Sequence, residues 1–292
     1  MRVHLVDGTY ELFRHHFALP PRADPAGIEI AATRGAVGSV LRMLEDGATH
    51  LVVATDHVVE SFRNALWDGY KSGEEMDPDL HKQFQILEDA LLALGVTVWP
   101  MVEFEADDGL ASGVAIAAAD ARVSQVLVCS PDKDLAQCVS GDRIVQVDRR
   151  KNEVRDEEGV IAKFGVRPAS IPDWLALTGD AADGFPGLPG WGAKSSALVL
   201  AQFGHIEQIP DSAADWGIPV RGADRLAAAL AKNRELANLF LDLATLRTTA
   251  DLGTVDSWRW SGATTDFKQW AIRLGSEELF HRAEQLAAER VI

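Results

Sequence analysis

The sequence has 292 residues, of which 47% are hydrophobic and 25% charged, a composition typical of a folded protein with a sizeable core and room for two domains. No run of about 18 apolar residues occurs and the N-terminus reads directly into a strand, so we expect neither a membrane span nor a signal peptide. The net charge of −16 argues against a nucleic-acid partner, since nucleic-acid-binding domains are usually basic, but this objection is weakened because phosphate affinity depends on local patches and not on the total charge.

Apolar runs that end in an acid mark the first part of the chain. Residues 3–6 and 51–54 read as buried strands, and they are followed by Asp7 and Asp56. One such Asp would often only cap a turn, but two are harder to attribute to chance. Between the strands, residues 28–44 have helical spacing. Ligands of open α/β sheets bind outside the carboxyl ends of the strands, where these acids are expected.

Residues 61–73 combine glycines, aromatic residues and two separated cations. Arg63 and Lys71 are candidates for phosphate contact, and Tyr70 or Trp67 could offer a stacking face. A solvated surface loop explains these residues equally well. An amphipathic helix at 80–94 and a strand at 96–99 follow.

The chain is organised around the stretch from 105 to 135, a helical run followed by the apolar strand 125–129. Acids stand at the start of the helix and after the strand: Glu105, Asp107, Asp108, Asp132 and Asp134. Carboxylates that converge repel one another unless a cation joins them. Magnesium prefers such oxygen ligands, and the histidines show no zinc spacing, so we predict a hard-metal site.

The spacing of these acids indicates more than one ion. On a helix that starts near Glu105, residues 105 and 108 share a face while Asp107 points elsewhere. Asp132 and Asp134 diverge by about 200° if they open a helical turn. Two metals about 4 Å apart clamp the attacking and leaving oxygens in phosphodiester cleavage, and one lowers the pKa of its water. Lys71 or Arg63 could then stabilise charge on the phosphate.

The remainder of the chain changes from strands to helices. A strand is expected at 143–147, and from about residue 160 helices alternate with Gly/Pro turns. The expected helices are 171–177, 197–203, 223–231, 233–246 and two at the C-terminus. Asp180 and Asp183 form a further carboxylate pair at i,i+3. The order predicts an α/β fold with a parallel sheet flanked by helices, followed by a helical region.

The glycine-rich loop before residue 197 nearly matches a phosphate-binding P-loop. Ala193 is one residue too many and the loop follows a helix rather than a strand, so nucleotide binding is not expected. A helix N-terminus can instead present free N–H groups to a nucleic-acid backbone, as in a helix–hairpin–helix. The candidate DNA-binding residues here are Gly187, Gly190, Gly192, Lys194 and Ser195.

In order along the chain, these motifs resemble the 5′-nuclease (flap endonuclease) superfamily, in particular the 5′→3′ exonuclease domain of bacterial DNA polymerase I, here standing alone. The carriers are 5–8 (Leu-Val-Asp-Gly), Asp56, 61–63 with Tyr70-Lys71, 105–108, 130–135, Thr178-Gly179-Asp180 with Asp183, and 187–197. The resemblance implies a PIN-like α/β core at 1–160 with a helical arch at about 57–85. The resemblance also implies that this core is followed by a helix-two-turn-helix DNA-binding region at 161–250 and by a C-terminal part at 251–292 that packs on the core.

The resemblance also implies roles for the acids. The first metal site is expected to contain Asp7, Asp56, Glu105, Asp108 and Asp132, and the second Asp107, Asp134, Asp180 and Asp183, with Mg²⁺ or Mn²⁺ as the ions. Lys71 corresponds to the active-site lysine of the family, and Tyr70 precedes it. The glycine loop resembles a potassium-assisted grip on duplex DNA.

The implied activity is hydrolysis of DNA at 5′ flaps, 5′ single-stranded ends or branches by a monomeric enzyme of DNA replication and repair. Exonuclease and flap-endonuclease action, and DNA or RNA–DNA hybrid substrates, are all compatible with these residues. Cys129 and Cys138 need no disulfide, which favours a reducing cytoplasm, and the activity would take place at the bacterial nucleoid.

Two departures from the family pattern bear on activity. Glu74 stands where a basic residue is usual after Tyr-Lys, and with Glu75 and Asp77 it makes the expected arch entrance acidic; Gly184 replaces an Asn. A branched-DNA binder with little catalysis is therefore one alternative. A Toprim-type enzyme would use Asp132-x-Asp134 but not Asp7, Asp56 or Asp180. A haloacid-dehalogenase-like phosphatase would need an acid where Leu5 stands.

Overall fold

A parallel sheet forms the centre of the first of two units in the computed structural model, which describes residues 1–290. The units contain residues 1–59, 73–130 and 248 onward, and residues 60–72 and 131–247. In the first unit the strands lie in the order β3-β2-β1-β4, all parallel. Their bounds are β1 Arg2–Asp7, β2 His50–Asp56, β3 Thr97–Met101 and β4 Gln125–Cys129.

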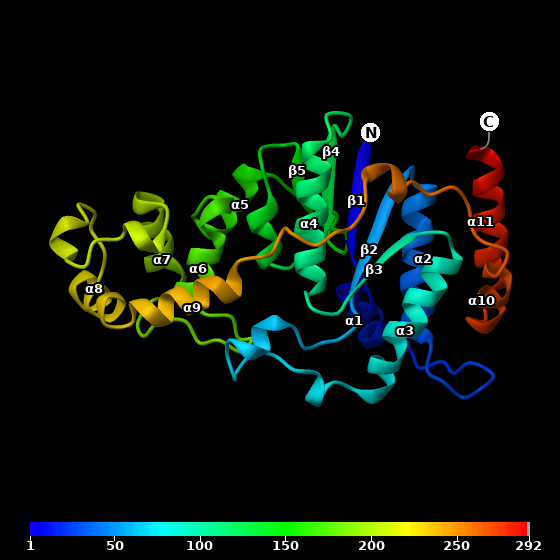
Figure 1. The fold of residues 1–292 in the computed structure, drawn as a ribbon, viewed down its shortest axis with the longest axis horizontal. Coiled ribbons are helices and arrows are strands. Elements are labelled where there is room, and N and C mark those ends of the chain that lie inside the picture. Colours follow the sequence, from blue (N-terminus) through cyan, green and yellow to red (C-terminus); the bar gives the residue numbers. More distant parts are fainter. Residues whose placement is uncertain (291–292) are drawn as a thin grey trace. The chain divides into compact units, whose positions relative to one another are not determined.

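Helices surround this sheet, as shown in Figure 1. They are α1 Gly8–Ala18, α2 Ala31–Glu45, α3 Pro78–Ala93 and α4 Ala106–Ala119. The first three helices pack on one another, while α4 contacts all four parallel strands. Gly113 permits this close approach, because a Cβ there would lie 2.6 Å from the Trp99 ring. Strand residues such as Val3, Leu5 and Val52 are fully buried, as expected for a sheet covered on both faces.

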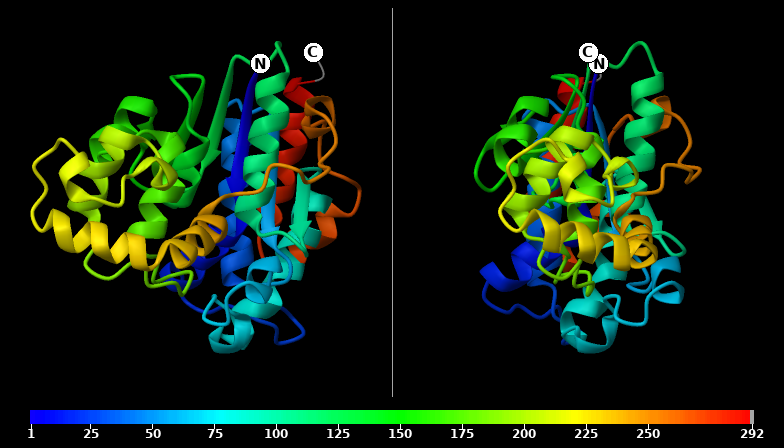
Figure 2. Two further views of the ribbon diagram at one scale, coloured as in Figure 1. Left: turned by 60° about the vertical axis from the view of Figure 1, so that its left-hand side comes forward. Right: turned by 90° about the vertical axis from the view of Figure 1, so that its left-hand side faces the viewer.

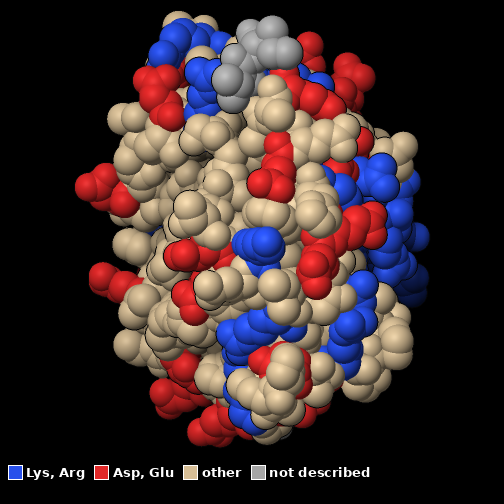
Figure 3. All heavy atoms as spheres, turned by 90° about the vertical axis from the view of Figure 1, so that its right-hand side faces the viewer, with Lys and Arg blue, Asp and Glu red and all other residues tan. Residues whose placement is uncertain are grey.

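The C-terminal residues return to the first unit. They form η7 Val255–Trp258, α10 Phe267–Arg273 and α11 Glu277–Arg290. Arg282 on α11 makes a bidentate ion pair with Glu45 on α2 at 2.7 Å, and the Trp258 and Trp99 rings meet edge to face. On the face that carries α10 and α11, basic side chains gather along one edge and in the lower part, with acidic ones between them (Figure 3).

The second unit is mainly helical and has its own core. Its regular elements are β5 Ile144–Asp148, β6 Glu153–Arg155, α5 Glu157–Phe164, α6 Ile171–Thr178, α7 Ala193–Phe203, α8 Ala223–Lys232 and α9 Arg234–Ala244. Strands β5 and β6 pair antiparallel. The helices enclose a core that includes Leu175, Trp216 and Phe240, and α6 lies against α9 (Figure 2).

The predicted α/β fold followed by a helical region is confirmed, but several elements differ from the sequence prediction. Residues 8–18 form α1 rather than only a turn, and α5 was not predicted. Residues 131–160 group with the helical unit because the 3₁₀ helix η3 Asp134–Cys138 packs on α6. Within 57–85, the structure has two short 3₁₀ helices, at 62–65 and 73–75, and then the start of α3.

Two further features agree with the composition. No helix within residues 1–290 is long and apolar enough to cross a membrane. Among the described residues, buried Cys129 and half-buried Cys138 form no disulfide.

Candidate metal centre and nucleic-acid-binding loop

Asp7 is fixed at the carboxyl end of β1. Its side chain caps α1, accepting a hydrogen bond from the Tyr10 backbone N–H at 2.8 Å, and its other oxygen accepts one from Ser130 Oγ at 2.8 Å. The chain turns directly at Gly8, where a Cβ would lie 2.6 Å from Val53 Cγ1 and 2.8 Å from the Ala54 carbonyl oxygen. A glycine is therefore required for Asp7 to stand beside β2.

The acids at the start of α4 are held by backbone N–H groups. Asp56, at the end of β2, accepts a hydrogen bond from the Ala106 N–H at 2.7 Å, and Asp108 accepts one from the Glu105 N–H at 3.0 Å. Glu105 and Asp108 are buried, and Asp107 is half-buried in the first turn of the same helix. Backbone N–H donors therefore fix the positions of Asp56 and Asp108 at the start of α4.

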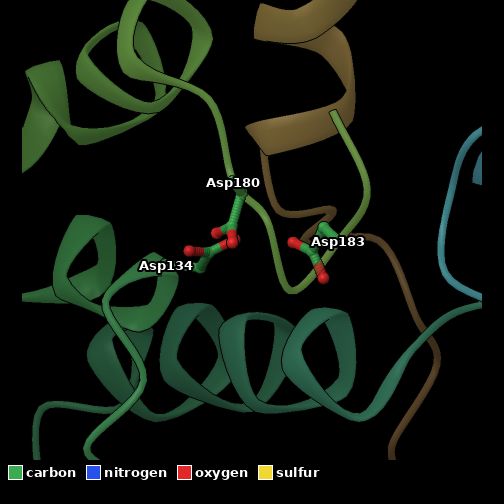
Figure 4. Close-up of side chains that lie close together, drawn as sticks. All are labelled: Asp134, Asp180 and Asp183. Atoms are coloured by element: carbon green, nitrogen blue, oxygen red, sulfur yellow. The ribbon is translucent and has the colours of Figure 1, made fainter. Parts of the chain in front are cut away.

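Three acids of the second unit converge, and we call Asp134, Asp180 and Asp183 the Asp134 triad. One carboxylate oxygen of each lies within 4.8 Å of the others, and all three residues are buried. Asp134 belongs to η3, while Asp180 and Asp183 lie on one loop, which is closed by backbone hydrogen bonds between Asp180 and Phe185. Figure 4 shows the Asp134 and Asp180 carboxylates close together with that of Asp183 beside them.

The electrostatics of the triad call for a cation. Burial raises the pKa of Asp134 well above its ordinary value of 3.8, and the negative charges of Asp132, Asp183 and Asp180 raise it further. Asp134 Oδ1 is buried and has no hydrogen-bond partner among the described residues. An unsatisfied buried carboxylate oxygen is costly. Oxygen-only donors at this spacing fit a hard divalent cation.

Two lysines supply part of the missing positive charge. Lys71 Nζ lies 2.8 Å from Asp183 Oδ1, and Lys133 Nζ lies 2.8 Å from Asp180 Oδ2. Burial opposes the charged form of Lys133, but its hydrogen bond to Asp180 and the nearby acids raise its pKa overall. Lys71 was predicted from the sequence to serve the site, whereas no role was predicted for Lys133. The position of Lys133 between Asp132 and Asp134 is the sequence feature that could have indicated one.

Asp132 stands outside the triad. Its side chain is exposed, whereas its carbonyl oxygen accepts a hydrogen bond from Gln146 Nε2, which fixes the turn after β4. Asp132 Oδ1 also accepts a bond from the Asp134 N–H at 3.3 Å. The residue therefore orients Asp134 and adds to its negative surroundings.

Two residues proposed for substrate contact lie in the core instead. Arg63 is 1% exposed, and its guanidinium donates hydrogen bonds to the Leu243 and Thr245 carbonyl oxygens at 2.8 and 3.2 Å. Tyr70 is buried in the core of the second unit. The burial of both side chains does not favour the predicted phosphate contact of Arg63 or stacking by Tyr70. Arg63 instead donates its hydrogen bonds to carbonyl groups at the end of α9 and in the turn that follows.

The glycine loop forms the predicted turn before a helix N-terminus. Gly187 and Gly190 have φ of +70° and +84°, and a Cβ on Gly187 would lie 2.3 Å from the Gly179 nitrogen. The loop leads to Gly192, the N-cap of α7, where Ser195 Oγ hydrogen-bonds to the Gly192 backbone at 3.1 and 3.0 Å. Lys194 is exposed in the first turn of α7.

Gly184, the departure from the family pattern, has a packing reason. Its φ is +82°, and a Cβ would lie 1.9 Å from the Gly69 carbonyl oxygen. The Gly184 carbonyl accepts a hydrogen bond from Trp67 Nε1 at 3.1 Å, and the Lys71 N–H donates to the Asp183 carbonyl at 3.1 Å. Gly184 therefore lets the segment that carries Lys71 lie directly against the loop of the triad.

Comparison with known families accounts for nearly the whole chain. Residues 2–165 match the family model of the 5′-3′ exonuclease N-terminal resolvase-like domain, and residues 166–266 match that of the 5′-3′ exonuclease C-terminal SAM fold. The chain belongs to the 5′-3′ exonuclease family. The predicted family membership is thereby confirmed, and the helical region is its SAM-fold part.

Curated relatives of this family include a separate exonuclease and longer polymerases. A 5′-3′ exonuclease of Aquifex aeolicus is 33% identical over 213 residues, covering 71% of each chain. DNA polymerase I of Mycobacterium leprae is 33% identical over 295 residues, 98% of this chain but 32% of the polymerase. The chain thus spans about a third of the length of the latter relative.

Solved structures share the fold at low sequence identity. The T5 D15 protein co-crystallised with metal ions has a TM-score of 0.66 at 17% identity and covers 99% of both chains. The catalytic core of Rad2 in complex with DNA has a TM-score of 0.62 at 19% identity, covering 98% of this chain and 90% of that one. At these identities the likeness concerns the fold.

Proposed function

We propose that this protein is a structure-specific, metal-dependent 5′ nuclease that hydrolyses phosphodiester bonds at 5′ ends, flaps or branches of DNA. The observation that carries the proposal is the Asp134 triad, a buried set of carboxylates with an unsatisfied oxygen, in a chain of the 5′-3′ exonuclease family. A buried acid cluster of this kind is costly to keep without a function that binds a cation.

The metal would be Mg²⁺ or Mn²⁺, with two or more ions bound. The proposed ligands are Asp7, Asp56, Glu105, Asp107 and Asp108 in the first unit, and Asp132, Asp134, Asp180 and Asp183 in the second. These acids would hold the ions, and the chemistry that such ions would supply is activation of a water molecule and neutralisation of negative charge at the phosphate. Oxygen donors suit both ions, and the buried triad supports the same choice as the sequence.

The residues of this chain have further roles in the proposed reaction. Lys71, held 2.8 Å from Asp183, would place its positive charge beside the phosphate and stabilise negative charge as it develops. The N–H groups at the start of α7, with exposed Lys194, would bind the duplex backbone without reading its sequence. The glycine turn at 187–192 is a candidate for potassium, which would add positive charge there.

The proposed substrate is DNA with a 5′ flap or a 5′ single-stranded end, and RNA–DNA hybrid is a second substrate to test. The solved neighbours include a pseudo-enzyme–product complex of the bacteriophage T5 flap endonuclease with DNA and metal ions, which supports a DNA substrate. We propose a monomer acting in replication and repair at the bacterial nucleoid. Glu74 and Asp77 are exposed acids, so we expect slow capture of a free single strand.

The test is cleavage of one 5′-flap duplex labelled at its 5′ end, in Mg²⁺, Mn²⁺ or EDTA. We expect metal-dependent cleavage near the branch, which is lost in Asp134→Asn and Asp132→Ala. Asp173→Asn is the matched control, because Asp173 is equally buried in the second unit but accepts its bonds from His205 and Ile206. Undiminished cleavage in EDTA, or by Asp134→Asn, would contradict the proposal, and binding without cleavage would identify a branched-DNA binder.

A further inference from the structure

At the carboxyl end of β2, the side chain of Asp56 and those of its two neighbours, Thr55 and His57, point to opposite sides of the sheet. Successive residues of a strand face opposite sides of the sheet. Asp56 lies on the α4 side, where its carboxylate accepts the Ala106 N–H at 2.7 Å. Thr55 and His57 both reach Glu88 on α3 instead.

Glu88 holds both neighbours of Asp56 with one carboxylate. Its Oε1 accepts a hydrogen bond from Thr55 Oγ1 at 2.7 Å, and its Oε2 lies 2.8 Å from His57 Nδ1. Thr55 and Glu88 are 0% and 2% exposed, so this contact is shielded from water. Hydrogen bonds to an ionised carboxylate are stronger than neutral ones, especially in a buried setting.

The backbone of Asp56 is fixed independently. Its N–H donates to Thr9 Oγ1 at 2.9 Å, a contact from α1. The position of the Asp56 side chain is therefore set by contacts from three helices: α1 holds its own N–H, α3 holds its two neighbours, and α4 receives its carboxylate. Of these contacts, only that from α3 is made by a buried acidic side chain, Glu88.

We propose that Glu88 is a positioning residue for Asp56, fixing the strand end so that the Asp56 carboxylate is aimed at a divalent ion. The inference rests on the proposed function, in which Asp56 is a metal ligand. Groups that orient metal ligands through hydrogen bonds cost about 10- to 100-fold in metal affinity or activity when removed. A buried carboxylate that served only in packing would stabilise the protein no more than an apolar side chain of similar size.

The experiment compares Glu88→Ala and Glu88→Gln with the wild type by Mn²⁺ titration calorimetry and by the Mg²⁺ concentration that gives half-maximal cleavage of the 5′-flap duplex. We expect Glu88→Ala to weaken Mn²⁺ binding and to raise the Mg²⁺ midpoint about 10- to 100-fold, with activity restored at high Mg²⁺. Glu88→Gln keeps the volume and one acceptor, so its shift should be smaller. Asp56→Asn should also weaken Mn²⁺ binding. In the double variant, the loss of Mn²⁺ affinity should be smaller than the product of the losses in the two single variants.

Gln83→Ala is the matched control. Gln83 is also fully buried on α3, but it accepts a hydrogen bond from the Thr33 N–H at 3.0 Å and so ties α3 to α2 rather than to β2. This variant should lower the melting temperature and leave the metal midpoint unchanged. A wild-type Mn²⁺ affinity and Mg²⁺ midpoint in both folded Glu88 variants would overturn the proposal.

The two proposals fail in distinguishable ways. Mn²⁺ binding by the wild type without cleavage of any 5′-ended substrate would refute the nuclease function, while calorimetry would still decide the role of Glu88. Cleavage with the expected metal dependence, combined with an unchanged metal affinity in both Glu88 variants, would refute only the role of Glu88.

Discussion

The two groups of acids in this protein are stabilised in different ways. In the first unit, Asp7, Asp56 and Asp108 each accept a backbone N–H at the start of a helix, so each carboxylate also serves as a structural cap. In the second unit, the Asp134 triad is buried among like charges and is balanced by Lys71 and Lys133, with one oxygen left unsatisfied.

This difference separates acids that also stabilise the fold without a cation from acids that we expect to be stabilised only by one. Caps of the first kind stabilise helices by about 1 kcal/mol each, whether or not metal is present. The triad stabilises nothing by itself, since its charges repel one another. Loss of an acid should therefore have opposite effects on the metal-free protein in the two units.

The largest expected effect concerns Lys71, the lysine beside the triad for which we propose a role in catalysis. Lys71→Met should lower the cleavage rate by about 10²- to 10³-fold, as expected when a group that stabilises developing charge is removed. Its ion pair with Asp183 is a third exposed on the lysine side, so the free energy of unfolding should change little. Single-turnover cleavage and chemical denaturation measure the two quantities. Equal losses of rate and stability would assign Lys71 a structural role.

Arg63 provides the contrast within the same unit, a cation that does not serve the triad. Arg63→Met removes donors to two carbonyl oxygens and should lower the free energy of unfolding by about 3 kcal/mol. The cleavage rate of the folded fraction should stay near that of the wild type. Denaturation and activity assays on the same samples decide this, and a stable but inactive variant would restore the substrate role predicted from the sequence.

Lys133 tests whether the lysines replace the missing charge. Lys133→Met leaves Asp180 buried without its partner and should destabilise the metal-free protein by about 2 kcal/mol. Saturating Mg²⁺ should remove most of this deficit, because the ion then compensates the acid. Urea denaturation with and without Mg²⁺ measures this loss of stability. A loss that is independent of the metal would show that Lys133 acts only in packing.

The smallest effect is expected in the first unit. Ser130→Ala removes one hydrogen bond to Asp7 and should cost about 1 kcal/mol in the free energy of unfolding, since Asp7 retains the Tyr10 N–H. The loss should not become smaller in Mg²⁺, because the cap that Asp7 provides does not depend on an ion. A deficit that disappears in Mg²⁺ would place Asp7 in the same class as the triad and remove the distinction between the units.

The sequence predicted those features that local pattern determines. The strand at 125–129 was predicted with its observed bounds, because a short apolar run between polar turns indicates a buried strand. Helix α1 was missed because Gly8, Glu11 and Leu12 alone are buried in it, so it lacks a full apolar face. Contacts between distant segments could not be read at all.

The candidate site shows the same limit. The family resemblance implied that Asp134, Asp180 and Asp183 share a metal site, and the structure brings these three acids together. The burial of Arg63 depends on carbonyl groups about 180 residues away, and no spacing near residue 63 reports them. Glu88 was overlooked for the same reason, because its partners lie on another element.

The most direct test of this account is the pH dependence of the free energy of unfolding in wild type and Asp134→Asn, with EDTA and with Mg²⁺. A carboxyl group whose pKa is raised by folding binds more protons when folded, so the metal-free wild type should lose stability as pH rises above about 3.8 through the raised pKa. The free energy of unfolding of Asp134→Asn should not show this fall with pH, so the variant should be more stable than the wild type in EDTA at neutral pH.

Mg²⁺ should reverse that order. At about 100 times its dissociation constant the ion should stabilise the wild type by about 2.7 kcal/mol and the variant far less. Identical pH profiles for the two proteins, together with equal stabilisation by Mg²⁺, would contradict the claim that the Asp134 triad is a cation site.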